Sequence, residues 1–115
     1  MKWINALTDY SHYLKIERGL SHNSIDSYIR DVKKLMGFLE ENDIIETPIA
    51  IDADCVKQFI YHASKSINAR SQSRLISGLR SFFDYLIFEN YRETNPLDLI
   101  ESPKIGRKLP DTLSV

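Results

Sequence analysis

The chain of 115 residues has the length of one small domain, and 43% hydrophobic with 27% charged residues is typical of a globular protein rather than a disordered one. A single cysteine, Cys55, excludes an internal disulfide and a cysteine-based metal site, and no apolar stretch approaches the roughly 20 residues of a membrane span. Without a signal-peptide pattern, we expect an intracellular, cytoplasmic protein with no membrane partner.

The charge is distributed unevenly along the chain. The net charge of −1, taken alone, argues against a nucleic-acid partner. However, the stretches from Lys65 to Phe83 and from Pro103 to Pro110 contain bases and no acid, whereas Phe38 to Asp54 contains six acids and no base. A nearly neutral domain with this pattern can still present one basic face.

Apolar residues recur with helical spacing in four segments, and no strand pattern competes with them. The first helix is expected from about Trp3 to Glu17, with Gly19 as its stop. The second is expected from about His22 to Glu41, with Ser21 as its N-cap. The apolar stripe of the first helix is predicted to contain Ile4, Leu7, Ser11 and Leu14, with Trp3 and Tyr10 beside it. That of the second is predicted to contain Ile25, Tyr28, Ile29, Val32, Leu35, Met36 and Leu39.

The third helix is expected from about Ala53 to Ser66, with Asp52 as its N-cap. The fourth is expected from near Ala69 to Glu89, and its cap is either Asn68 or Ser71. The fold class is therefore all-α, a bundle of four helices.

The chain becomes irregular after the fourth helix, because Pro96, Pro103 and Pro110 exclude a long helix there. A short helix near Leu97 to Glu101 fits the pattern. We expect one domain over residues 1–101 and an extended linker over residues 102–115, whose composition suggests that a further domain follows.

Two polar helix faces are the candidate functional surface. Arginine can neutralise phosphates or contact a guanine edge, and serine can donate to a phosphate oxygen while it allows a close approach. The outer side of the fourth helix holds Arg70, Ser73, Arg74, Ser77, Arg80, Ser81 and Asp84, and that of the second helix holds Asn23, Ser27, Arg30 and Lys34, with Lys33 adjacent. The alternative is that both are ordinary solvated faces, and Asp26 and Asp31 beside the second set weaken the DNA hypothesis.

No catalytic constellation is evident in the sequence. His12, His22 and His62 lack metal-ligand spacing, no tyrosine has evident basic partners, and no glycine-rich phosphate loop occurs. Cys55 near a helix N-terminus could have a lowered pKa, although a packing role is the preferred interpretation. We therefore expect this chain alone to be no enzyme, with no metal and no cofactor.

Three stretches resemble the tyrosine recombinases, also called phage-type integrases, and within them the Xer branch. Residues 20–32 are similar to the family's second-helix motif, with Ser24-Ile25, Tyr28 and Asp31 in register. Residues 73–86, followed by Glu89 and Asn95-Pro96, resemble its fourth-helix signature. The last stretch is similar to the linker that opens the catalytic domain, and its matching residues are Ser102-Pro103-Lys104, Arg107, Leu109-Pro110 and Leu113-Ser114. Within the Xer branch, Glu101 to Lys104 favours a XerD-like over a XerC-like protein.

The resemblance implies a SAM-like core-binding domain that forms one jaw of a clamp around duplex DNA. The family's strand exchange through a 3′-phosphotyrosyl intermediate is carried out by a catalytic domain, which would lie beyond Val115. The family works as a tetramer on two duplexes, in DNA integration and in chromosome dimer resolution and partition linked to the cell cycle. DNA contact is thereby implied for Asn23, Ser27, Arg30, Lys34, Arg70, Arg74, Ser77 and Arg80, and for Arg107 and Lys108 of the linker.

A competing hypothesis is a helical protein-interaction module without DNA affinity. It explains the nearly neutral net charge directly. It does not explain why bases concentrate on the outer faces of the second and fourth helices.

Overall fold

A computed structural model describes residues 2–100 and contains four α-helices and one short 3₁₀ helix. The α-helices are α1 (Trp3–Ile16), α2 (His22–Glu41), α3 (Ala53–Ala63) and α4 (Ala69–Phe88), and the 3₁₀ helix is η1 (Pro96–Leu99). Within this range no strand is present, so the all-α four-helix fold predicted from the sequence is confirmed. The expected linker over residues 102–115 lies outside the described residues.

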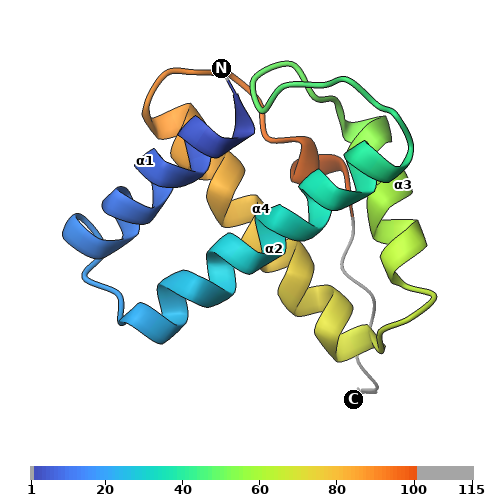
Figure 1. Cartoon of the computed structure of the whole chain (residues 1–115), viewed down its shortest axis with the longest axis horizontal. Helices are drawn as coiled ribbons and strands as arrows, with labels where there is room; N and C mark the ends of the chain where they lie inside the picture. Colours follow the sequence, from blue (N-terminus) through green and yellow to red (C-terminus); the bar gives the residue numbers. More distant parts are fainter. Residues whose placement is uncertain (1, 101–115) are drawn as a thin grey trace, which may run out of the picture.

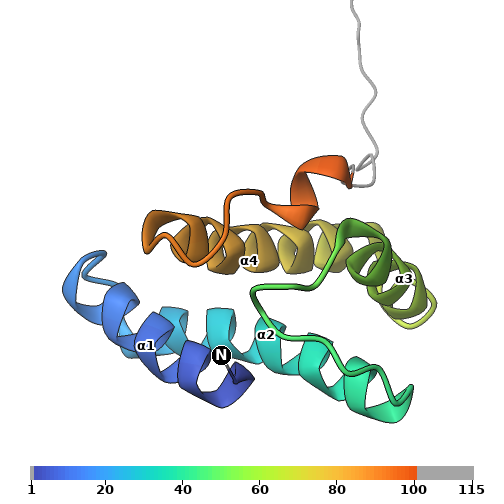
Figure 2. The same cartoon turned by 90° about the horizontal axis from the view of Figure 1, so that it is seen from above.

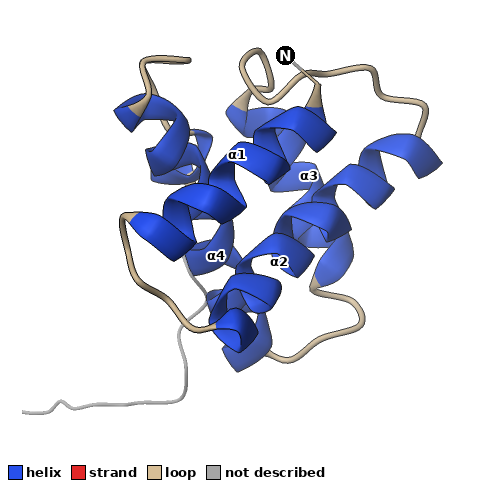
Figure 3. Cartoon of the chain, turned by 60° about the vertical axis from the view of Figure 1, so that its left-hand side comes forward, coloured by secondary structure: helices blue, strands red, loops and turns tan. Residues whose placement is uncertain are grey.

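The helices form two layers that cross each other. α1 and α2 lie side by side, joined by a short turn (Figure 3), and α4 runs behind them as the second layer, with α3 at one end (Figures 1 and 2). The core forms between the layers, because α4 presents Leu79, Phe82, Phe83 and Leu86 to it, all fully buried. Tyr10 of α1 packs edge-on against Phe82, with ring centroids 5.2 Å apart. α4 is therefore the central element of the fold.

Side-chain caps fix where three of the helices begin. The Ser21 hydroxyl accepts from the amide of Ser24, and the Asp52 carboxylate accepts from that of Cys55, as the sequence predicted. The open choice at α4 is decided in favour of Asn68, whose side chain accepts from the Ser71 amide. Gly19 has φ +60°, the left-handed conformation that ends α1.

Two sequence-based expectations about the helices were wrong in detail. The third helix ends at Ala63 rather than Ser66, and residues 64–66 form a turn, with the Ser64 and Ser66 hydroxyls bonded to backbone carbonyls. The stripe of α1 is also displaced: Leu7 and Leu14 are buried as expected, but Ile4 is 58% exposed, and Ala6 and Tyr10 are fully buried. The large ring of Tyr10 fills the core instead, and its hydroxyl donates to Ser81 Oγ at 2.9 Å.

Arg92 lies in the loop after α4 and fastens it to the loop before α3. Its guanidinium lies 5.1 Å from the ring centroid of Phe83 and donates to the carbonyls of Pro48 (3.0 Å) and Thr94 (2.6 Å). Its pKa is lowered by burial. The loop before α3 and the loop after α4 are thereby held together, and η1 follows with Leu97 fully buried.

The two layers approach closely at the crossing of α2 and α4, where Gly78 faces Asp31. A Cβ atom placed on Gly78 would overlap the Asp31 carboxylate. Asp31 is only 2% exposed, and it lies in α2 next to the fully buried Val32. Glycine at position 78 therefore makes room for a carboxylate inside the helix crossing.

Gly78→Ala is expected to destabilise the chain by about 1–2 kcal/mol, because overpacking costs about 1–3 kcal/mol and the better helix propensity of alanine returns up to about 1. The matched control is Gly37→Ala in α2, where an added Cβ meets nothing within 4 Å. This control should gain up to about 1 kcal/mol. Urea denaturation checks both values, and a Gly78→Ala chain as stable as the parent would contradict the close contact.

Candidate nucleic-acid interface

The polar faces of α2 and α4 are joined by the side chain of Arg74. Arg74 Nη2 donates to Ser27 Oγ at 2.7 Å, and Nη1 donates to Asp31 Oδ2 at 3.3 Å. Arg74 is 57% exposed, so its guanidinium lies at the surface with the buried carboxylate beneath it. One arginine of the fourth helix is thus held by two side chains of the second helix.

Asp31 is a charged group in an environment that disfavours its charge. Burial raises the pKa of this carboxyl above its ordinary value, and the nearby cations Arg74, Lys34 and Arg30 act in the opposite direction. These three bases surround a single buried acid. All three cations are exposed, whereas Asp31 is buried.

A shallow groove follows the crossing of the two helices, and we call it the crossing groove. It consists of two hollows, of about 240 Å³ and about 270 Å³, which share Tyr28 and Ser77. Its lining is rich in hydroxyl and guanidinium groups. The first hollow is lined by Ser24, Ser27, Tyr28, Arg74, Ser77 and Gly78, and the second by Tyr13, Arg18, Tyr28, Ser77, Arg80, Ser81, Asp84 and Tyr85.

Most of the residues singled out from the sequence lie on or beside this groove. Ser27, Arg74, Ser77 and Arg80 line it directly. Arg30 and Lys34 are exposed next to Asp31. Asn23 and Arg70 are exposed near the first turns of α2 and α4, and these helix ends lie along the same lower edge of the molecule in Figure 1. Arg107 and Lys108 lie outside the described residues.

Arg80 differs from the other candidates because η1 engages it. Its Nη2 donates to the Leu97 carbonyl at 3.1 Å, and its Nη1 lies 3.4 Å from the Asp98 carboxylate. The sequence predicted that Arg80 lies on the polar side of α4. It did not predict the contact with η1, because that contact depends on how the chain folds back after α4. Arg80 therefore connects the crossing groove to the end of the described chain.

Asp31 was expected only to flank the polar set of the second helix, but in the structure it is 2% exposed and accepts a hydrogen bond from Arg74. A signal was available, since Asp31 follows Tyr28 by three residues and precedes Leu35 by four, the spacing of the apolar stripe. Six groove residues lay on neither polar face described from the sequence: Tyr13, Arg18, Ser24, Tyr28, Gly78 and Tyr85. Ser24 and Tyr28 lay within the motif of the second helix. Arg18 lay in a turn, where periodicity gives no information.

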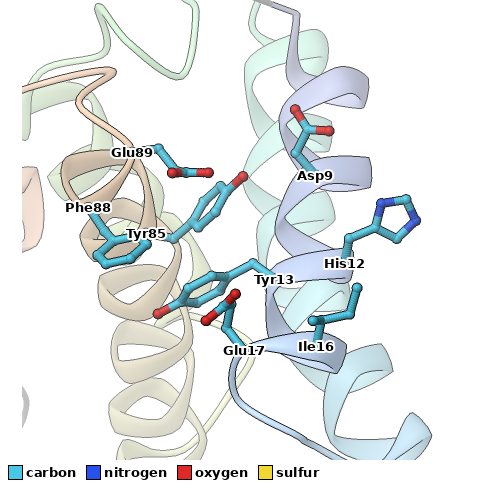
Figure 4. A pocket seen from close by; sticks show the side chains of 8 residues that line it. All are labelled: Asp9, His12, Tyr13, Ile16, Glu17, Tyr85, Phe88 and Glu89. Carbon is cyan, nitrogen blue, oxygen red and sulfur yellow. The ribbon is translucent and has the colours of Figure 1, made fainter.

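A third hollow, of about 360 Å³, lies between α1 and the end of α4 and has a different character (Figure 4). The rings of Tyr13, Tyr85 and Phe88 gather in it, while Asp9, Glu17 and Glu89 give it a negative rim. Burial, followed by the charges of Asp9 and Glu89, raises the pKa of Tyr85 to about 12. Its acidic rim makes this hollow less suited to a phosphate than the crossing groove, with which it shares Tyr13 and Tyr85.

The other groups considered for chemistry have structural surroundings. Cys55 is buried and burial raises its pKa, which agrees with the packing interpretation and not with an activated thiolate. Burial likewise raises the pKa of Tyr10. Over residues 2–100, no three His, Cys, Asp or Glu side chains cluster as metal ligands would. None of the helices in that range combines the length and apolar character of a membrane span.

The fold and groove define a small all-α domain with a polar crossing of two helices, and comparisons with known proteins identify its family. Residues 7–90 match the family described as phage integrase, N-terminal SAM-like domain. The chain therefore belongs to this family. The SAM-like bundle expected from the resemblance is confirmed.

Individual relatives agree with this assignment. The chain is 36% identical over 110 residues, 95% of its length, to the tyrosine recombinase XerD of Staphylococcus epidermidis and to that of Staphylococcus aureus. The expected resemblance to the XerD-like branch is thereby confirmed. The chain spans 37% of the length of these recombinases. An integrase from mycobacterium phage Brujita shares the fold, with a TM-score of 0.74 at 15% identity over 91% of this chain and 34% of that one.

The raised pKa of Asp31 predicts a specific dependence of stability on pH. Its ordinary value is 3.8, and because the folded-state pKa is higher, ionisation of Asp31 favours the unfolded chain. The stability that the protonated Asp31 carboxyl contributes to the folded chain is fully present below the ordinary pKa. This stability is lost as the pH rises through the folded-state pKa. Relative to Asp31→Asn, the parent should therefore lose about 1.4 kcal/mol of stability for each pH unit between these two pKa values.

Urea denaturation of both chains from pH 3 to pH 7 measures this difference. In an Arg74→Ala background the loss should be larger, because Arg74 is the main group that lowers the pKa of Asp31. A stability difference that stays constant, or a parent that gains stability over Asp31→Asn as the pH rises, would show that the pKa of the carboxyl is not raised.

Proposed function

We propose that this chain is a DNA-binding domain of a site-specific tyrosine recombinase. The observation that carries the proposal is the gathering of arginine and serine side chains of α2 and α4 around the crossing groove, with the exposed cations Arg30 and Lys34 close to Asp31. The family and the name of the relatives, tyrosine recombinase XerD, support the same function.

The composition of the surface suits phosphate recognition. Arg30, Lys34 and Arg70 are exposed cations, and no ion pair of theirs is seen within residues 2–100. Small hydroxyl side chains such as Ser77 allow a backbone to approach the helix closely and can donate to a phosphate oxygen. The proposed contact set is Asn23, Ser27, Arg30, Lys34, Arg70, Arg74, Ser77 and Arg80, together with Arg107 and Lys108 outside the described residues.

The role we assign to the domain is positional. Held on the duplex through these contacts, it would keep the scissile phosphate in register for a catalytic domain. Neither this chain's tyrosines nor its histidines would take part in strand cleavage. The full protein would cut and rejoin DNA as a tetramer on two duplexes in the cytoplasm, in integration or in chromosome dimer resolution and partition linked to the cell cycle.

A second candidate is a protein-interaction module without DNA affinity. The observation in its favour is the exposed apolar end of α1 and α4, where Ile16 is 75% and Phe88 is 64% exposed beside the hollow of Figure 4. Such a surface is typical of a contact with another protein. It can coexist with DNA binding at the first hollow of the groove, with which it shares no lining residue, although it shares Tyr13 and Tyr85 with the second hollow.

DNA binding predicts a strong dependence of affinity on salt. Four neutralised phosphates would give a slope of log affinity against log salt of about −3 to −4. Replacing both Arg30 and Arg70 with Ala should weaken binding and reduce the steepness of the slope by about 2, since each lost phosphate contact contributes about 0.9. Fluorescence anisotropy with a short duplex carrying a Xer-type half-site, and with a scrambled duplex, measures these slopes at several salt concentrations.

The control is the double variant Lys2→Ala, Lys57→Ala, which changes the net charge by the same amount. Lys2 precedes α1, and Lys57 lies on α3, so both are outside the proposed contact set. The control should keep the slope of the parent. If the Arg30, Arg70 double variant and the control have equal salt slopes, the DNA lies elsewhere on the domain. Absence of binding even at low salt would favour the protein-interaction module.

A further inference from the structure

The α2–α4 crossing contains an arrangement that packing alone does not require. A buried carboxylate carries a desolvation penalty, and an apolar side chain of similar size at such a site is often equally or more stabilising. Here Asp31 is 2% exposed, and Gly78 lacks the side chain that would otherwise fill its place. Both features cost stability, and both serve to place one negative charge beneath Arg74.

The two acceptors fix the Arg74 guanidinium in one orientation. A guanidinium has five N–H donors, and the bonds to Ser27 and Asp31 occupy two of them. Three donors remain on a side chain that is 57% exposed. They are held next to the hydroxyls of Ser24 and Ser77 in a hollow of about 240 Å³, which is large enough for a phosphate group.

We propose, on the basis of the DNA-binding role above, that Asp31 is a positioning residue that orients Arg74 to bind one backbone phosphate of DNA in the hollow lined by Ser24, Ser27 and Ser77. Asp31 does not touch the phosphate. It acts by holding the guanidinium in its binding orientation before the DNA arrives, and Ser27 assists as the second acceptor. A free arginine side chain would lose its rotational freedom on binding, which weakens affinity.

Asp31 has a second effect on DNA binding, and the affinity of a single variant would not separate it from the orienting effect. Its negative charge repels a phosphate, so Asp31→Asn removes a repulsion and an orienting contact at the same time. A double-mutant cycle separates the two, because the repulsion acts whether or not residue 74 is an arginine. The informative quantity is the cost of Arg74→Ala, measured once in the parent background and once in the Asp31→Asn background.

The experiment measures the affinity of the four chains of this cycle for the half-site duplex at low salt. Arg74→Ala should weaken binding about tenfold when Asp31 is present, as expected for a charge-assisted hydrogen bond. In the Asp31→Asn background the cost should fall to about threefold or less. The same cycle with Ser27→Ala in place of Asp31→Asn should also show a reduced cost of Arg74→Ala. Because Ser27→Ala leaves the buried site unchanged, this cycle tests the proposal even if Asp31→Asn does not fold.

A second measurement tests the orienting contact without DNA. In ¹⁵N NMR spectra, the Nη groups of Arg74 should give separate, slowly exchanging signals in the parent, and these should merge in Asp31→Asn. Merged signals in the parent would overturn the proposal. An equal cost of Arg74→Ala in both backgrounds would also overturn it, because Asp31 would then be purely structural. A larger cost in the Asp31→Asn background would overturn it as well, because the carboxylate would then mask Arg74.

The outcomes also separate this proposal from the DNA-binding role. If the chain binds DNA with the predicted salt slope but Arg74→Ala has no effect, the DNA-binding role stands and the positioning role of Asp31 is wrong. If the parent binds no DNA at low salt, the DNA-binding role itself fails, and the positioning role fails with it.

Discussion

The contact between the Asp31 carboxylate and Gly78 determines how α2 and α4 cross, and the rest of the fold depends on that crossing. α4 supplies the centre of the core, and α1 packs on it through Tyr10 and Phe82. Because the two helices meet where a side chain is absent, their polar faces approach closely enough for Arg74 to reach both Ser27 and Asp31. The same contact that joins the layers thus forms the crossing groove.

Local signals predicted the helices well, because caps and turns are formed within a few residues. Ser21, Asp52 and Gly19 act within one turn of the chain, so the sequence suffices to find them. The burial of Asp31 depends on a helix more than forty residues away, with Arg74 as its partner. The bond from Arg80 to the Leu97 carbonyl depends on the return of the chain after α4. Helical periodicity carries no information about such tertiary contacts, so they could not be predicted from the sequence.

The net charge of −1 illustrates why a total is a poor guide to partners. Three acids, Asp9, Glu17 and Glu89, line the hollow between α1 and α4. The exposed cations Arg30 and Lys34 lie on the other polar surface, above a carboxylate that is screened from solvent. The two surfaces therefore differ in electrostatic character, although Asp84 also lines the crossing groove.

The overlap that a Cβ atom at position 78 would make with Asp31 also constrains how this sequence can drift. A side chain at position 78 requires the Asp31 carboxylate to shift or to be replaced by a smaller residue, and either change disturbs the acceptor of Arg74. Three positions on two helices are thereby tied to one another in their variation. Divergent sequences that keep this bundle are expected either to retain the aspartate, glycine and arginine together or to change them as a group.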